Sequence, residues 1–383
     1  MIDSEHVPGQ QTWAWPALRE AQRAVLLDVL VHGTRSRADL ARRTGLSRAS
    51  LSRLTRDLGE LGLVRELDAA PSEGRGRPSE MIEIVPESAC FLGFKLTGDA
   101  LYAAVIDLSA NVLHAEGEPL VTREVEDVVA LIARTTSRLV ERHPRIAAVG
   151  VCLAGDVRHD AALGAVVVGS AFLGWDEVPI ESLIRKATGL PVAVSNDVQA
   201  LTAAHHWFGA GVGASSLAVI GVGAGIGCGI VVNDDPVAGA QGHPGKIGHL
   251  PVGRTDAVCD HGHVGCVSAF VTIPAILKNA GSASFWETIE AAGSGTPQAE
   301  WAFHAAAEAL GAVIATITNL VDPERIIVTG EGLPIAELYG DELHDAVAKR
   351  LDPTSAMPQV VLQPFTFTDY AWGAAVTAII ALV

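Results

Sequence analysis

Residues 36–64 hold the feature that most constrains how this chain folds, because they predict two short helices separated by a tight turn. Ser36 and, three residues later, Asp39 have the form of a capping box, which indicates the start of the first helix. Gly45 ends that helix, and Ser47 is suited to cap the second. The second helix has one apolar face, formed by leucines at helical spacing: Leu51, Leu54, Leu58 and Leu61. This arrangement predicts a helix-turn-helix.

The outer face of the second helix is rich in arginine and serine, side chains that hydrogen-bond to the phosphates and base edges of DNA. The alternative is a small helical bundle whose arginines are merely solvated. We expect DNA binding, through Ser47, Arg48, Ser50, Ser52, Arg53 and Arg56.

A glycine- and proline-rich segment, EGRGRP at residues 73–78, separates two stretches of alternating apolar residues. This pattern predicts the wing of a winged helix, with Arg75 and Arg77 at its tip. A tip without bulky side chains fits a narrow minor groove, which attracts arginine electrostatically. The alternative is an ordinary disordered linker.

The net charge of −17 is unevenly distributed along the chain. Residues 17–80 contain 12 arginines and 9 acidic residues, whereas the remainder is strongly acidic. This contrast predicts a nucleic-acid-binding module on a body that does not bind nucleic acid. Five cysteines are too few for a disulfide framework and indicate a reducing cytoplasm. The longest uncharged apolar run, residues 370–383, is shorter than the roughly 20 residues of a spanning helix, so no membrane contact is expected.

From about Cys90 the pattern changes to apolar strands that alternate with helices, which indicates an α/β body. Asn196 and Asp197 stand at the end of a buried strand, where open α/β sheets bind ligands. A glycine-rich hairpin follows at residues 221–229.

These features resemble the ROK family of bacterial sugar-responsive repressors and sugar kinases, as do GW at residues 174–175, GHPGKIGH at 242–249 and CDHGHVGC at 259–266. The helix-turn-helix resembles that of the repressor branch. The resemblance implies a multidomain α+β and α/β chain, in which a winged helix-turn-helix precedes a two-lobed actin-like (ASKHA, ribonuclease H-like) ATPase fold. The expected domains are the winged helix-turn-helix at 17–86, lobe I at 88–196 with helix 370–383 packing back on it, and lobe II at 197–369 with a zinc site.

ROK proteins typically bind zinc through one histidine followed by three cysteines, at a fixed spacing. Here His249, Cys259, His261 and Cys266 keep that spacing, with His261 in place of one cysteine. Four protein ligands leave no open coordination position, so the resemblance implies a structural zinc ion. His263 is a competing ligand, and reduced cysteines in a turn without metal are the alternative.

Four substitutions distinguish this chain from the kinases of the family, one of which is Thr97 in place of the first glycine of the phosphate-binding loop. Lys95 replaces the aspartate of the phosphate-binding loop, and Lys246 and Ser268 replace two sugar-binding glutamates. Asp197 matches the catalytic base of the kinases. The resemblance therefore implies that the body is not an enzyme but a degenerate kinase that senses a sugar or a sugar derivative. The expected effector-binding residues are Asn196, Asp197, Lys246, His249 and Ser268.

The expected function is that of a cytoplasmic repressor of carbohydrate-utilisation genes, a homodimer or homotetramer that binds an operator and a carbohydrate effector. Lys246 favours an acidic or phosphorylated sugar, unless it points to solvent or pairs with Asp197. The alternatives are a ROK sugar kinase with an appended DNA-binding module, and a scaffold whose body serves only to dimerise.

Overall fold

The computed structural model describes residues 13–67 and 80–383. Its first part is a helix-turn-helix followed by an antiparallel pair of strands. Ser36 Oγ accepts a hydrogen bond from Asp39 N, and Gly45 ends the helix in the left-handed conformation with φ 68°. The predicted wing tip, with Arg75 and Arg77, lies outside the described residues. The elements are α1 (Glu20–His32), β1 (Arg35–Ser36), α2 (Arg37–Thr44), α3 (Arg48–Glu60), β2 (Val64–Leu67) and β3 (Met81–Ile84).

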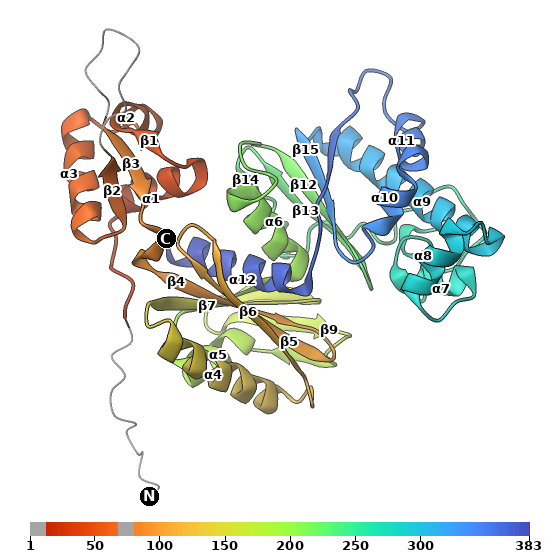
Figure 1. The fold of residues 1–383 in the computed structure, drawn as a ribbon, viewed down its shortest axis with the longest axis horizontal. Coiled ribbons are helices and arrows are strands. Elements are labelled where there is room, and N and C mark those ends of the chain that lie inside the picture. Colours follow the sequence, from red (N-terminus) through yellow and green to blue (C-terminus); the bar gives the residue numbers. More distant parts are fainter. Residues whose placement is uncertain (1–12, 68–79) are drawn as a thin grey trace, which may run out of the picture.

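Lobe I is built on a five-stranded sheet with the order β11-β7-β4-β5-β6. Strands β4, β7 and β11 are parallel, and β5 and β6 extend the sheet antiparallel to them. Helices α4 and α5 cover one face and α12 the other (Figure 1). The elements are β4 (Cys90–Leu96), β5 (Ala100–Asp107), β6 (Val112–Pro119), α4 (Val125–Arg142), β7 (Ile146–Leu153), a small sheet of β8 (Asp156–Asp160), β9 (Gly164–Ser170) and β10 (Trp175–Val178), then α5 (Ile180–Thr188), β11 (Val192–Asn196) and α12 (Phe367–Leu382).

Lobe II repeats this plan with a second five-stranded sheet, in the order β14-β13-β12-β15-β16. Helix α6 (Asp197–Phe208) runs from the end of β11 toward this lobe and packs on β12 and β13. Two sheets of this kind, each with its own helices, give the two-lobed architecture that the sequence predicts. The elements are β12 (Leu217–Val222), β13 (Ile226–Val232), β14 (Asp235–Pro236), α7 (Ile273–Ala280), α8 (Phe285–Gly293), α9 (Pro297–Val321), β15 (Arg325–Thr329), α10 (Pro334–Leu338), α11 (Gly340–Ala348) and β16 (Gln359–Leu362).

Helix α9 has the length and hydropathy of a membrane-spanning helix. In the structure 67% of its most apolar window is buried within the protein. Its side chains form the centre of the lobe II core, so its hydropathy is that of a core helix.

Helix α12 lies almost in backbone contact with the sheet of lobe I. A Cβ atom at Gly93 of β4 would lie 1.9 Å from the carbonyl oxygen of Ala371, and one at Gly150 of β7 would lie 1.8 Å from that of Ala374. The two glycines therefore set how closely the helix can approach.

The winged helix and lobe I share a single apolar core. The same cluster of buried residues contains Leu26 of α1, Leu58 of α3, Phe91 of β4 and Ile379 of α12. Trp15, which precedes α1, packs edge-on against Phe91 with the ring centroids 5.9 Å apart. The helix-turn-helix domain is thus docked on the body by buried apolar contacts.

We expect Gly150→Ala to destabilise the protein by about 3 kcal/mol or more, because the methyl group would push α12 off the sheet. Urea unfolding followed by circular dichroism measures this change. Gly169→Ala in β9 is the matched control, since a Cβ atom there meets nothing within 4 Å. Equal stability of the two variants would contradict the importance of this contact.

Candidate functional site

The outer face of α3 presents arginines that have no ion-pair partner in the described part of the chain. Arg48, Arg53 and Arg56 are exposed. Other arginines of this domain do bind carboxylates, for example Arg19 with Asp57 at 2.8 Å; the remaining paired ones are Arg37, Arg42, Arg43 and Arg65. The positive charge of α3 is therefore available to an anionic partner.

The start of α3 is fixed by its cap. Ser47 Oγ accepts a hydrogen bond from Ser50 N at 3.2 Å and donates one to Ser50 Oγ at 2.9 Å. The buried face consists of Leu51, Leu54 and Leu58, whereas Leu61 caps the helix and is 43% exposed. Ser52 lies on the exposed face. Three of the four predicted leucines thus pack α3 against the rest of the domain. The amino terminus of α3 is exposed and suited to binding a phosphate.

A cleft of about 660 Å³ lies between the two lobes. The ends of β4, β7 and β11 line it from lobe I, and the β12–β13 turn and residues 242–246 line it from lobe II. Asn196, Asp197 and Lys246 are among its lining residues. A cleft at the carboxyl ends of parallel strands is where an α/β sheet binds a small molecule.

The other two predicted effector residues, His249 and Ser268, do not line this cleft. His249 turns its ring toward the two cysteines, with Nδ1 3.7 Å from Cys266 Sγ. Ser268 follows Cys266, and its backbone N donates to the Gly248 carbonyl oxygen at 2.7 Å. His249 and Ser268 therefore support the loop of residues 242–248, whose first part lines the cleft.

Lys95 is buried at the base of the cleft, only 3% exposed. Its ammonium group donates a hydrogen bond to Asp197 Oδ2 and lies 4.3 Å from the centroid of the Tyr370 ring. The other oxygen, Oδ1, accepts from Val198 N at 2.9 Å. Both oxygens of the residue that matches the kinase base are thus engaged within the protein.

The ion pair between Lys95 and Asp197 was not among the predictions from the sequence, although the order of the strands indicates it. Lys95 on β4 and Ser195 on β11 lie opposite the same residue of β7, Cys152. Because the three strands are parallel, residues that end them meet at one edge of the sheet. The lysine at the end of β4 therefore belongs beside Asp197.

Lys246 pairs with a carboxylate of the other lobe and not with Asp197. Its Nζ lies 2.9 Å from Asp156 Oδ2, and the side chain is 62% exposed. Asn196 is likewise occupied: Oδ1 accepts from Val198 N at 2.9 Å, and Nδ2 donates to the Gly155 carbonyl oxygen at 3.1 Å. The asparagine thus fixes the start of α6 as its cap.

Glu331 enters the cleft from the turn after β15, and the sequence interpretation did not single it out. A Cβ atom at Gly223, in the glycine turn between β12 and β13, would lie 2.6 Å from Glu331 Oε2. Burial raises the pKa of Glu331. A carboxyl group therefore lies where this glycine turn would otherwise receive a phosphate.

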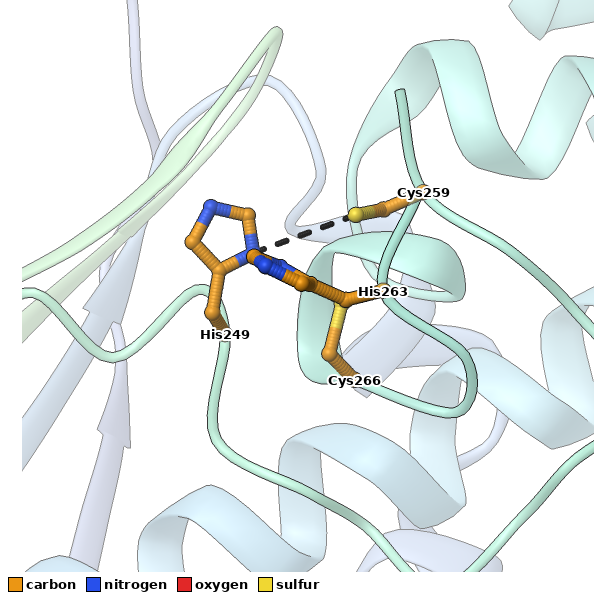
Figure 2. A group of neighbouring side chains, drawn as sticks. All are labelled: His249, Cys259, His263 and Cys266. Carbon is orange, nitrogen blue, oxygen red and sulfur yellow. Dashed lines mark hydrogen bonds between the residues drawn. The ribbon is translucent and has the colours of Figure 1, made fainter. Parts of the chain in front are cut away.

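Four side chains of lobe II converge as a potential metal site (Figure 2). The ligand atoms of His249, Cys259, His263 and Cys266 all lie within 4.8 Å of one another. Burial lowers the pKa of His249, which favours the neutral imidazole that binds metals. Two sulfurs and two imidazole nitrogens are the donor set that zinc binds tetrahedrally.

The histidine from the turn is His263, whereas the spacing predicted His261. Cys259 N donates to the His263 carbonyl oxygen at 3.0 Å, which closes a tight hairpin, and Gly262 at its tip has φ 81°. This turn directs His263 toward the cysteines. The ring of His261 stays beside His249, with the centroids 5.0 Å apart, but outside the group of four.

The ROK family model matches residues 91–379. The chain therefore belongs to the ROK family. The model of the IclR helix-turn-helix domain matches residues 23–68. The chain is 25% identical to the xylose repressor of Caldicellulosiruptor bescii over 349 residues, which are 85% of this chain and 86% of that protein.

Two solved structures show how the parts of the chain compare. A ROK family transcriptional regulator, a homologue of Escherichia coli Mlc, superposes with a TM-score of 0.80 at 23% identity, over 94% of this chain and 96% of that chain. The ROK hexokinase of Thermus thermophilus superposes with a TM-score of 0.66 at 25% identity, over 76% of this chain and 99% of that chain. The shared fold thus extends over nearly the whole length of the regulator.

We expect Asp197→Leu to destabilise the protein by about 3–5 kcal/mol, because it leaves the Lys95 ammonium group buried without its carboxylate. The double variant Lys95→Met/Asp197→Leu should recover most of that loss, since neither charge then remains. Urea unfolding of the two single variants and the double variant measures the coupling. Additive losses would show that the two side chains do not stabilise each other.

Proposed function

We propose that this protein is a DNA-binding transcriptional repressor of carbohydrate-utilisation genes, whose body binds a sugar without phosphorylating it. The observation that carries the proposal is the combination of arginines on α3 that pair with no carboxylate of the described residues and a cleft in which Lys95 binds Asp197. The similarity to a xylose repressor over most of both chains supports it.

The ion pair between Lys95 and Asp197 argues against a sugar kinase. A general base must be free to accept the proton of the sugar hydroxyl, and here both carboxylate oxygens already accept hydrogen bonds. Lys95 also cannot bind magnesium, and the side chain of Glu331 occupies the space beside the glycine turn where a phosphate would bind. A degenerate kinase that retains ligand binding accounts for these features.

The charges of the cleft favour a neutral sugar as the effector. Both of its lysines already bind carboxylates, Lys95 with Asp197 and Lys246 with Asp156. An acidic or phosphorylated sugar would have to break one of these pairs, with Glu331 nearby. Phe172, which lines the cleft and is 45% exposed, offers an apolar face to a sugar ring.

A structural zinc ion is the proposed occupant of the His/Cys group. With four protein ligands it would supply no catalytic chemistry, and it would tie His249 to the hairpin of Cys259 and Cys266. The loop of residues 242–246, which lines the cleft, leads directly to His249. The metal would therefore hold one wall of the effector site.

The proposed setting is the cytoplasm, with the protein acting as a homodimer or homotetramer on double-stranded DNA. A helix-turn-helix protein reads a two-fold related site with two copies of its recognition helix. The five cysteines are all free, as a reducing compartment maintains them.

We expect Arg53→Ala to weaken binding to the operator by about 5- to 150-fold, the loss of one base contact of about 1–3 kcal/mol. The operator is first selected from random double-stranded DNA with the purified full chain, and affinity is then measured by fluorescence anisotropy. Arg19→Ala, which removes an arginine already paired with Asp57, should bind normally. A chain that selects no sequence, or an Arg53→Ala variant with full affinity, would contradict DNA reading by α3.

We expect His263→Asn to abolish zinc binding and His261→Asn to retain it, because His263 belongs to the converging group. Elemental analysis of the purified full-length variants measures the bound zinc. The two histidines lie on the same hairpin, so each variant controls for the other. The reverse result would assign the ligand to His261.

A further inference from the structure

We propose that helix α6 transmits occupation of the cleft to the DNA-binding domain, and that Phe208 is the positioning residue at its receiving end. The inference rests on the proposed function, to which it adds the element that connects the two sites. Helix α6 begins in the cleft at Asp197 and ends at Phe208, about 17 Å away at roughly 1.5 Å per residue.

The first turn of α6 belongs to the cleft wall. Asp197 and Gln199 line the cleft, and Gln199 Nε2 donates a hydrogen bond to the carbonyl oxygen of Gly242 in lobe II. That bond, 3.2 Å long, joins the helix to the loop on the opposite side of the cleft. A ligand that moves this loop therefore acts directly on the start of α6.

The middle of α6 is packed on both sides without free space. A Cβ atom at Gly229 of β13 would lie 1.9 Å from Thr202 Oγ1, so the sheet of lobe II touches the helix. On the other side, a Cβ atom at Gly373 of α12 would lie 3.0 Å from the backbone of Ala200. Close-packed interiors transmit displacement rather than absorb it, so α6 follows a shift of lobe II relative to α12.

The last turn of α6 reaches the DNA-binding domain. Helices α6 and α1 are in contact, and Ala204 is fully buried in the apolar core that also contains Val25 and Leu26 of α1. Phe208 packs against the same core. A displacement of α6 therefore changes the packing of the helix on which α3 rests.

A second contact at this end joins the β13–β14 hairpin of lobe II to the last turn of α6. Asp234, at the tip of the β13–β14 hairpin, lies with Oδ1 3.4 Å from His206 Nε2. Burial and the Arg43 guanidinium lower the pKa of His32, the last residue of α1, and the Asp234 carboxylate acts on that pKa in the opposite direction. The hairpin tip is therefore close enough to α1 to interact with it electrostatically.

Helix α12 also reaches the cleft, through Tyr370. Its main contacts are with the strands of lobe I and with α6, so it stays with the lobe on which the DNA-binding domain is docked. Motion of lobe II consequently reaches that domain through α6.

The test is a mutational cycle between the two ends of α6 in the full chain. Asp197→Asn perturbs the cleft end, and amide hydrogen exchange along α1 reports the far end. We expect Asp197→Asn to change the exchange of α1 amides, and Phe208→Ala to remove that change. Phe285→Ala is the matched control, since Phe285 is a half-buried phenylalanine in the lobe II core. It should leave the response intact.

The effects of substitutions at two sites this far apart add up unless the two sites are energetically coupled. The proposal is overturned if Asp197→Asn leaves the amide exchange of α1 unchanged. It is also overturned if Asp197→Asn changes that exchange equally in the native chain and in the Phe208→Ala variant. Phe208→Leu, which retains an apolar side chain, gives the answer if the alanine variant fails to fold, because it should weaken the response in part.

A second measurement uses the selected operator with D-xylose, D-glucose or N-acetyl-D-glucosamine as the probe. We expect Phe208→Ala to reduce the change in operator affinity caused by the sugar from the usual 5- to 150-fold range to about one, with unchanged sugar affinity. An unaltered effect of the sugar would refute the relay. Absence of DNA binding or of sugar binding would instead contradict the proposed function, and the exchange experiment would still decide the role of α6.

Discussion

The close contact between α12 and the sheet of lobe I is the constraint on which the rest of the structure depends. Gly93 and Gly150 let the helix approach to backbone distance, and any side chain there would collide with it. Because α12 lies so close to the sheet, its outer surface is placed to receive two other elements. Helix α6 packs on it at Gly373, and the winged helix packs on its last turns.

The cleft shows how a fold shared with sugar kinases can engage the position of the kinase base in an ion pair within the protein. The base position is occupied by an aspartate, but it is paired with a buried lysine of β4, which is separated from β11 by β7. A buried ion pair contributes little net stability compared with apolar residues, although the loss of one partner is costly. A substitution at Lys95 alone would therefore be costly, because it leaves Asp197 buried without its partner.

The sequence predicted the helix-turn-helix well because caps and a turn glycine are local signals. Ser36, Gly45 and Ser47 each act as predicted. The two-lobed body followed from the resemblance to the ROK family, not from periodicity. The pairing of Lys95 with Asp197 was accessible from strand order, but requires the register of three strands that are far apart in sequence.

Other features depend on geometry that spacing does not encode. The hairpin around Gly262 directs His263, and not His261, into the converging group of side chains. The roles of His249 and Ser268 beside the cleft, and not in it, depend on the path of a loop. The apolar pattern of α12 indicated burial, but not that the helix shares a core with the winged helix.

That shared core means the DNA-binding domain is not a detachable module. Ile379 of α12 and the following Val383 are buried in the same cluster as the leucines of α1 and α3. Helices α1 and α3 thus acquire part of their core only after residues more than 300 positions later have been synthesised. A chimera that transplants the helix-turn-helix domain alone would carry an exposed apolar surface.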